Sequence, residues 1–418
     1  MNRLKKHKLS ELYEISSGIS TKPEQYGVGS PFLSFRTIFN NYFIPEELNE
    51  FMNTNETEQE TYSVKKGDVF LTRTSETLDE LAMSCVALKD YPSATFSGFA
   101  KRLRPIQNDI IYDKFMGFFL RSKYFRKIID NNAIMTLRAS FNEKIFSYLN
   151  IELPKYKEQV KIGNLLHLLE EKIKLNKKVN IELEKLAKTL YDYWFVQFDF
   201  PDENKRPYKS SGGAMVYNEI LKREIPVGWR VKELQNIASI SNEQIAPFEG
   251  VTYRHYSIPA FDEKGTYIIE LGDDIHSNKF IIKPFDVLIS KLNPRFSRVI
   301  CADNEDNMLS STELIVFRCN DEQNQSIVYC IAKSDNFYSY CVKNATGSSG
   351  SHNRINSEIM GAYKIPYNHS TYELFKSRIS DIIQKRNHII KENQKLISIR
   401  DFLLPMLMNG QISIATTE

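Results

Sequence analysis

Cysteine is scarce in this chain, and no two cysteines have the spacing of a metal site or a redox centre. The 418 residues include five cysteines and no C-x-x-C sequence: Cys85, Cys301, Cys319, Cys330 and Cys341. This pattern excludes a zinc ribbon or a disulfide framework and is typical of reduced thiols. The lysine-rich first residues lack the apolar run of a signal peptide, and no run of about 18 apolar residues exists that could cross a membrane. We therefore expect a cytoplasmic protein.

The chain also lacks a strong charge of either sign and the motifs of common enzymes. Its net charge is +3 with 26% charged residues, so a nucleic-acid-binding protein of this composition must gather its basic residues on one surface. No G-x-x-x-x-G-K-[ST] sequence is present for nucleotide hydrolysis. The seven histidines are scattered without a nucleophile beside them. The sequence predicts no catalytic site and no metal site in this chain.

Two short sequences resemble catalytic motifs but depart from them. Asn293-Pro294-Arg295-Phe296 is similar to the Asn-Pro-Pro-Phe signature of adenine methyltransferases, but the second proline is missing. No glycine-rich cofactor loop follows a strand upstream of it. The acidic residues of the segment Pro201–Lys205 lie too close together in one loop to converge on a metal ion from adjacent strands. Neither sequence therefore supports an enzyme.

What the chain does contain is an internal duplication, which is its strongest signal. The matching segments, in chain order, are Lys8–Leu12 with Arg230–Leu234, Gly67–Arg73 with Phe285–Lys291, Ile151–Pro154 with Tyr363–Pro366, and Glu184–Leu186 with Gln394–Leu396. The offset drifts only from 222 (233 − 11) to 210 (396 − 186). One ancestral unit is present twice, and the length differences lie in loops.

Each copy mixes short strands with helices. The apolar runs Val69–Thr72 and Val287–Ser290 follow turns that contain aspartate, and they are predicted strands. Apolar spacing predicts helices over Asp113–Asp130 and Ser326–Val342. The fold class predicted is therefore α+β, with two tandem α/β blocks that each precede a long helix.

The two long helices carry apolar residues at seven-residue steps, interrupted by asparagines. We expect them to pair as an antiparallel coiled coil with pseudo-two-fold symmetry, and the asparagines and Arg386 to set its register. The predicted seam comprises Leu166, Leu169, Ile173, Asn176, Asn180, Leu183, Leu190 and Trp194 with Ile383, Ile390, Asn393, Ile397 and Leu404. Leu165, Leu168, Val179 and Leu186 lie beside the seam, and an unpartnered apolar ridge predicts a protein partner.

A polar stretch rich in proline, serine and glycine separates the two halves and is predicted to be a linker. The domain boundaries expected are residues 1–152 for the first block, 153–199 for the first helix, 200–224 for the linker, 225–365 for the second block, 366–410 for the second helix and 411–418 for a tail.

Basic, hydroxyl and amide residues cluster at predicted strand ends in both blocks, where we expect their side chains to project. Arginine and lysine neutralise phosphates, while arginine and asparagine also read base edges. For any one of these residues, a solvated surface position is an equally good interpretation, and the argument depends on their repetition. The candidates for DNA binding are Arg36, Thr37, Thr72, Arg73, Thr74, Arg102 and Arg138 in block one, and Arg254, His255, Ser290, Lys291, Asn293, Arg295, Ser349, His352, Asn353 and Arg354 in block two.

Two similar but non-identical readers joined by helices suit a target in two parts. About 40 helical residues at roughly 1.5 Å each span about 60 Å. That length corresponds to at most about 17 base pairs at roughly 3.4 Å per pair along each strand.

Taken together, these features of the sequence resemble the specificity (S) subunit of type I restriction–modification enzymes. The resemblance is carried by the two repeats, by Leu190–Asp199 after the first helix, by Ile225–Trp229 at the start of the second block and by Leu403–Ile412. It covers essentially the whole chain, and no single motif decides it.

The resemblance implies a DNA-reading scaffold without catalytic activity. In this family each block is a target recognition domain that reads one half of a bipartite site. The helices act as a spacer and dock two methyltransferase (M) subunits, which carry S-adenosylmethionine. Two restriction (R) subunits supply the ATP- and Mg-dependent nuclease. No cofactor is expected in this chain.

Two other interpretations remain open. One is the specificity chain of a combined restriction and methylation system such as type IIB or IIG, which shares this architecture but pairs with a fused nuclease–methylase. The other is a coiled-coil scaffold with no role at nucleic acid, for which the loop residues Arg73, Lys291 and Arg354 would be dispensable.

Overall fold

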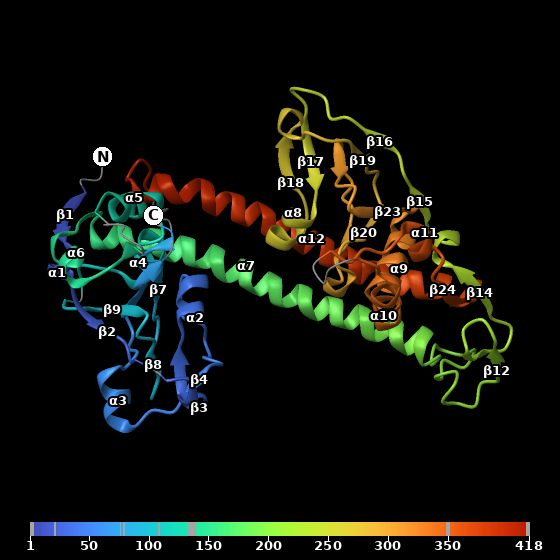
Figure 1. Cartoon of the computed structure of the whole chain (residues 1–418), viewed down its shortest axis with the longest axis horizontal. Coiled ribbons are helices and arrows are strands. Elements are labelled where there is room, and N and C mark those ends of the chain that lie inside the picture. Colours follow the sequence, from blue (N-terminus) through green and yellow to red (C-terminus); the bar gives the residue numbers. More distant parts are fainter. Residues whose placement is uncertain are drawn as a thin grey trace. The chain divides into compact units, whose positions relative to one another are not determined.

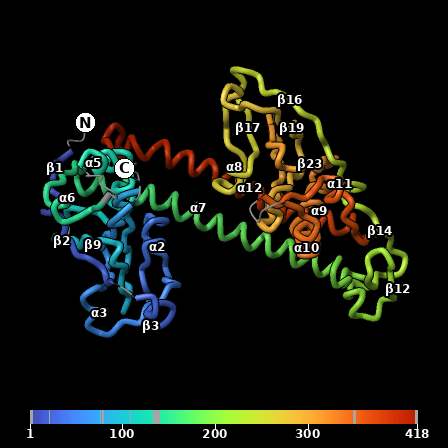
Figure 2. Tube along the Cα trace, viewed as in Figure 1, coloured from blue at the N-terminus to red at the C-terminus, as the bar shows by residue number. Residues whose placement is uncertain are grey.

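The computed structural model describes residues 4–20, 22–75, 77, 80–107, 109–132, 139–347 and 352–414. The chain forms two compact units (Figure 1): unit 1 contains Met1–Lys174 and Lys395–Glu418, and unit 2 contains Leu175–Gln394. The boundaries between the units fall inside the long helices α7 (Tyr156–Tyr191) and α12 (His369–Met408). In Figure 2 the red end of α12 belongs to the same unit as the blue N-terminal block. Each unit therefore combines one recognition block with parts of both helices.

Unit 1 is built on an antiparallel four-stranded sheet in the order β2-β9-β5-β7. A three-stranded sheet in the order β4-β3-β8 and the pairs β1–β11 and β6–β10 complete its strands. The strands are β1 (Lys5–Lys8), β2 (Tyr13–Ser17), β3 (Tyr26–Leu33), β4 (Phe51–Met52), β5 (Val69–Thr72), β6 (Thr74–Ser75), β7 (Ser84–Val86), β8 (Thr95–Phe96), β9 (Ala100–Pro105), β10 (Ala139–Ser140) and β11 (Asn150–Leu153). The helices are α1 (Leu9–Leu12), α2 (Phe35–Asn40), α3 (Glu56–Thr61), α4 (Asp113–Phe119), α5 (Lys123–Asn132) and α6 (Glu143–Tyr148).

The core of unit 1 explains why its central strand is apolar on both faces. Val69 and Leu71 of β5 pack with Phe115 of α4, while Phe70 points to the opposite side and packs on Phe96. Successive side chains of a strand alternate between faces, so a strand that is buried on both sides carries apolar residues on both faces, as Val69, Phe70 and Leu71 do. Leu166 of α7 joins the same core with no exposed surface, and the last turns of α12 cover it.

Unit 2 repeats this topology. Its four-stranded sheet has the order β15-β23-β20-β21, and a larger sheet has the order β16-β19-β22-β17-β18. The strands are β14 (Arg230–Glu233), β15 (Ser239–Ser241), β16 (Gln244–Ile245), β17 (Thr252–Tyr256), β18 (Ile268–Leu271), β19 (Lys279–Ile281), β20 (Val287–Ser290), β21 (Val299–Cys301), β22 (Met308–Ser310), β23 (Leu314–Arg318) and β24 (Lys364–Tyr367). The helices are α8 (Ile258–Lys264), α9 (Glu322–Lys333), α10 (Asp335–Asn344) and α11 (Ser357–Gly361).

The duplicated fold predicted from the sequence is confirmed. Strand β5 lies between β9 and β7, just as β20 lies between β23 and β21, and β1 pairs with β11 as β14 pairs with β24. Even the buried ion pair recurs. Asp68 accepts hydrogen bonds from Arg104 Nε at 2.7 Å and Nη2 at 2.6 Å. Asp286 accepts from Arg318 Nε at 3.3 Å and Nη2 at 3.2 Å.

Within each unit the segments of α7 and α12 run antiparallel. In unit 1, Arg400 Nη1 binds Glu170 Oε2 at 2.8 Å, and in unit 2, Asn176 Nδ2 donates to Asn393 Oδ1 at 2.9 Å. Of the residues expected in the seam, those that the structure buries are Leu166, Ile173, Asn176, Trp194, Ile383 and Asn393. Those that remain partly exposed are Leu169, Asn180, Leu183, Leu190, Ile390, Ile397 and Leu404.

The helix bounds differ from the predicted 153–199 and 366–410. Leu153 pairs with Lys5 in β11, so α7 begins only at Tyr156. After Tyr191 the chain continues as a single π-helical turn, Asp192–Val196, which buries Trp194. Pro366 belongs to β24, and α12 starts at His369. Pro154 directly follows β11 and Pro366 lies within β24, so neither proline opens a helix.

The prediction that residues 200–224 form a linker is wrong. Strands β12 (Met215–Asn218) and β13 (Arg223–Pro226) make an antiparallel hairpin there. Phe200 stacks on Tyr208 at 4.8 Å between ring centroids, and Arg223 Nη2 donates to the Phe195 carbonyl at 2.7 Å. These few aromatic and cationic anchors order a stretch whose average composition is polar. None of the helices in the described part of the chain combines the length and the apolar composition that crossing a membrane demands.

Candidate nucleic-acid interface

In block one, the end of the central strand presents one exposed cation. Arg73 follows β5 and its side chain is exposed. Its backbone is held on both sides, because its N–H donates to the Phe99 carbonyl at 2.8 Å and its carbonyl accepts from Phe141 N–H at 2.8 Å. A guanidinium on such a rigid backbone is well placed to meet a phosphate or a base edge.

Block two repeats this backbone arrangement around Lys291, which follows β20. Its N–H donates to the Glu313 carbonyl at 3.0 Å, and its carbonyl accepts from Ile355 N–H at 3.0 Å. Lys291 is half-buried, whereas Arg73 is exposed. The two blocks thus offer a cation from the same position of the same fold.

The expectation that Thr72, Ser290 and Arg102 project from strand ends is wrong. They are 0%, 3% and 8% exposed. The Thr72 hydroxyl donates to the Glu80 carbonyl and accepts from Met83 N–H, and Ser290 Oγ donates to the Leu292 carbonyl. Both hydroxyl residues lie in the four-stranded sheets themselves, and their hydroxyl groups are satisfied inside the protein.

Arg102 is held in the same way, which makes it a structural cation in this conformation. Its Nη1 donates to the Ser63 carbonyl at 2.7 Å, and its guanidinium lies 5.3 Å from the Phe96 ring centroid. Burial lowers the pKa of Arg102, and the neighbouring Arg104 lowers it further.

Arg254 and His255 of β17 are also engaged within block two. Arg254 Nη2 binds Glu305 Oε2 at 3.0 Å. His255 Nδ1 lies 2.7 Å from Glu270 Oε2, yet burial lowers the pKa of His255 more than Glu270 raises it. At neutral pH the imidazole is therefore mostly neutral and donates its Nδ1–H to the carboxylate, so it adds little positive charge to the surface.

The remaining candidates of block one differ in exposure. Arg36 of α2 is exposed, and Thr37 Oγ1 donates to Glu50 Oε1 at 3.3 Å. Thr74 lies in β6 (Thr74–Ser75), which pairs with β10 (Ala139–Ser140). Arg138 lies outside the described residues, and so does Ser349 of block two.

The segment after Lys291 is a strained turn. Asn293 and Ser297 have φ angles of 48° and 45°, and Pro294–Phe296 forms a single 3₁₀ turn between them. Non-glycine residues with positive φ are uncommon and cluster at functional sites. Arg295 and Phe296 of this turn are exposed.

The strained turn is fastened to the segment that carries the last candidates of block two. Asn293 N–H donates to the Asn353 carbonyl at 2.7 Å, and the backbones of Arg354 and Leu292 form an isolated antiparallel β-bridge. His352 and Arg354 are exposed. Lys291, Asn293, Asn353 and Arg354 are thereby brought together.

Sequence reasoning missed two residues at these strand ends. Glu313, whose carbonyl holds Lys291, has a side chain that binds Arg354, and Phe99, whose carbonyl holds Arg73, is 62% exposed. Glu313 directly precedes β23 and Phe99 directly precedes β9, and each of these strands lies next to the central strand of its sheet. Aligning the two repeats through these strands would have found them.

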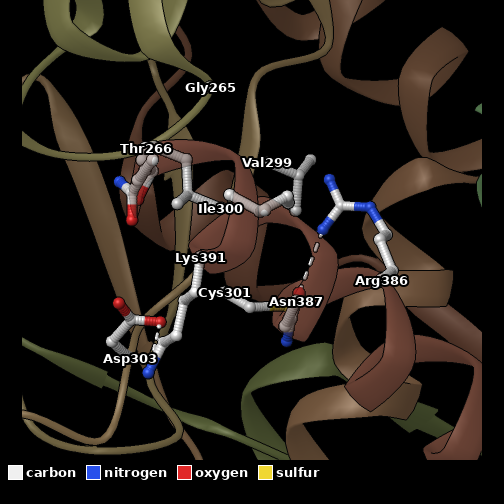
Figure 3. A pocket seen from close by; sticks show the side chains of 11 residues that line it. Gly265, Thr266, Val299, Ile300, Cys301, Asp303, Arg386, Asn387 and Lys391 are labelled. Carbon is white, nitrogen blue, oxygen red and sulfur yellow. Dashed lines mark hydrogen bonds and ion pairs between the residues drawn. The ribbon is translucent and has the colours of Figure 1, made fainter. Parts of the chain in front are cut away.

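A hollow in unit 2 lies between α12, β21 and the end of α8 (Figure 3). Lys391 Nζ binds Asp303 Oδ1 at 3.3 Å across it, and Arg386 Nη1 donates to Asn387 Oδ1 at 3.1 Å. The Lys391–Asp303 ion pair therefore joins the second block to α12. Among the residues that the structure describes, no group of three histidine, cysteine or acidic side chains could hold a metal ion.

The long helices also present apolar side chains to solvent. Contiguous exposed apolar surface on a helix is typical of a protein–protein contact. The most exposed are Leu168 (67%), Leu175 (56%), Ile181 (55%) and Leu186 (47%) on α7, and Ile399 (47%) and Phe402 (64%) on α12.

Comparison with known proteins gives a consistent result. Residues 1–185 match the model of the type I restriction modification DNA specificity domain. The chain is 24% identical to the type I restriction enzyme MjaIX specificity subunit of Methanocaldococcus jannaschii, over 97% of this chain and 93% of the relative. It is 22% identical to the type I restriction enzyme HindI specificity subunit of Haemophilus influenzae, over 91% of this chain and 94% of the relative.

A solved structure shares the fold. The crystal structure of a type I restriction–modification system S subunit from M. genitalium aligns with a TM-score of 0.61 and 15% identity. The alignment covers 99% of this chain and 97% of that one. The resemblance inferred from the repeats is confirmed by these matches.

Proposed function

We propose that this chain is a specificity subunit of a type I restriction enzyme and that it reads a bipartite DNA target with one half-site for each block. The observation that carries the proposal is the duplicated strand end, where Arg73 and Lys291 are held by the same backbone hydrogen bonds in two copies of one fold. The residues around the two cations differ, so the two half-sites differ in sequence.

The helices are proposed to dock partner subunits. Two methyltransferase (M) subunits would cover the exposed apolar side chains of α7 and α12, such as Leu168 and Phe402. Restriction (R) subunits would join through them. S-adenosylmethionine, ATP and Mg would be bound by those partners, and this chain would catalyse no step.

The proposal is tested by sequencing the methylated bases in DNA from a methylation-deficient host that expresses this chain with its methyltransferase partner. We expect one new methyladenine motif made of two short half-sites separated by unspecified base pairs. A continuous motif would contradict the two-reader model. No motif at all, with both proteins expressed and assembled, would favour a scaffold without a role at DNA.

Removing the strand-end cations is expected to weaken DNA binding. Arg73→Ala or Lys291→Ala should each cost about 1–3 kcal/mol if the cation contacts a base, and the loss should fall on one half-site. A phosphate contact would instead weaken all sequences alike and lower the salt dependence by about one unit of slope. The measurement is fluorescence anisotropy of the assembled complex with labelled duplexes at several salt concentrations.

Lys66→Ala is the matched control. Lys66 is exposed in block one, just before the other end of β5. It should leave affinity and sequence preference unchanged. An equal loss with Lys66→Ala would mean that general positive charge, and not position, decides binding.

A further inference from the structure

Block two carries at its strand end an ion pair whose two partners have no charged counterparts at the equivalent positions of block one, which Phe99 and Ser140 occupy. Arg354 Nε lies 3.0 Å from Glu313 Oε2, and Arg354 Nη2 lies 3.4 Å from Glu313 Oε1. The pair is therefore bidentate. The Glu313 side chain is 30% exposed and the Arg354 side chain is 46% exposed, so both can reach a ligand without leaving each other.

The backbone of both residues is fastened to the end of the central strand. Glu313 carbonyl accepts from Lys291 N–H at 3.0 Å, and Lys291 carbonyl accepts from Ile355 N–H at 3.0 Å, next to Arg354. Arg354 and Thr346 exchange both backbone hydrogen bonds at 2.9 Å. The guanidinium fork is thus held in one orientation from its backbone and from its carboxylate partner, which lowers the entropy lost on binding.

A carboxylate weakens binding on a surface that only contacts phosphates, because the carboxylate and the phosphate repel each other. On a surface that reads bases, a carboxylate can accept a hydrogen bond from a base. The guanidinium fork matches the O6 and N7 acceptors of guanine, and a glutamate accepts from the N4 amino group of cytosine. A donor fork beside an acceptor therefore matches the major-groove edge of a G·C pair, whereas an A·T pair places an amino donor next to N7.

We infer that Glu313 and Arg354 together read a G·C base pair in the half-site of block two. The inference rests on the proposed function. Arg354 binds the guanine edge. Glu313 orients the fork and accepts from the cytosine amino group, which makes it a specificity-determining residue.

Block one has neither partner at the equivalent positions. Phe99 stands where block two has Glu313, since its carbonyl accepts from Arg73 N–H at 2.8 Å, and it is 62% exposed. Ser140 stands before Phe141, whose N–H bonds to the Arg73 carbonyl, as Arg354 stands before Ile355. The G·C rule therefore applies to one half-site only.

The experiment uses the complex of this chain with its methyltransferase partners and labelled duplexes that carry the methylated motif. In one series, each G·C pair of the block-two half is replaced by A·T in turn. The wild-type complex should discriminate against A·T at one position by about tenfold or more. Glu313→Gln keeps the shape but loses the charge, and Arg354→Lys keeps the charge but loses the fork. Both should reduce discrimination at that position to about twofold and leave the block-one half unchanged.

Glu219→Gln is the matched control, because Glu219 forms an exposed ion pair with Lys222 in the turn between β12 and β13. It should change no base preference. A block-two half-site without any G·C pair would overturn the inference, as would an equal loss of affinity for all duplexes in Glu313→Gln. A wild-type complex that yields no bipartite motif would overturn the proposed function itself, and this outcome is distinct from the other two.

Discussion

Replacing Arg318 by methionine is expected to lower the free energy of unfolding of unit 2 by about 3–5 kcal/mol, because a buried carboxylate then loses its partner. Asp286 has no exposed surface, and Arg318 supplies two of its hydrogen bonds. The backbone N–H of Lys283, at 2.9 Å, would remain. The same reasoning applies to Arg104→Met beside the buried Asp68 in unit 1.

The loss in Arg318→Met should depend on pH. Burial raises the pKa of Asp286 even with Arg318 present, and removing the guanidinium removes the main opposing influence. A carboxyl group whose pKa is higher in the folded than in the unfolded state destabilises the fold as pH rises. The variant should therefore be closer to wild type near pH 4 than at pH 7.

Urea unfolding at the two pH values measures this difference. Lys222→Met, which breaks the exposed pair with Glu219, serves as the control and should stay within about 0.5 kcal/mol of wild type. A loss in Arg318→Met that is the same at both pH values would show that lost packing, and not the stranded carboxylate, destabilises the variant.

Placing a charge in the helix seam is expected to have an effect of similar size. Ile383 of α12 is 1% exposed and packs in the main core of unit 2 with Ile379 and Tyr191. Ile383→Asp both opens a cavity and buries an unpaired charge, so we expect a loss of more than about 4 kcal/mol. Loss of cooperative urea unfolding followed by circular dichroism is the readout.

Gln384→Asp tests whether the burial of the charge is responsible. Gln384 is the next residue of the same helix and is exposed. Gln384→Asp introduces the same charge as Ile383→Asp and changes the helix propensity by a similar small amount, but it buries nothing. It should therefore lower the free energy of unfolding by about 1 kcal/mol or less. If both variants unfolded alike, negative charge on α12 and not burial would be the cause.

The sequence correctly predicted the strands that occur in both repeats. It gave a wrong prediction for a segment whose polar composition resembles that of a linker. Duplicated segments such as Gly67–Arg73 and Phe285–Lys291 placed the two central strands correctly, because both copies must bury the same apolar run. The stretch around Tyr208 was predicted to be a linker because its average composition is polar. A few aromatic residues such as Phe200 order it, and an average over the segment does not show them.

The interface was harder to predict for a geometric reason. Arg73 and Thr72 are neighbours in sequence, yet one is exposed and the other has no exposed surface, since alternate residues of a strand face opposite ways. Glu313 and Arg354 lie 41 residues apart and meet only because both are bonded to the segment after β20. A single sequence does not show such pairings.

The discontinuity of unit 1 bears on how this chain is made. Its core includes Leu166 from α7 and Leu407 and Met408 from the end of α12, and 220 residues (394 − 174) separate the two parts of the unit. Translation at roughly 5–20 residues per second needs about 10–45 s to cross that interval. Unit 2 cannot close its own core until late in this interval, because Ile379 and Ile383 of α12 belong to it. Leu166 and its neighbours are made earlier and wait longer with an open apolar face. Chaperone binding to the nascent chain should therefore concentrate on residues 1–174 of unit 1.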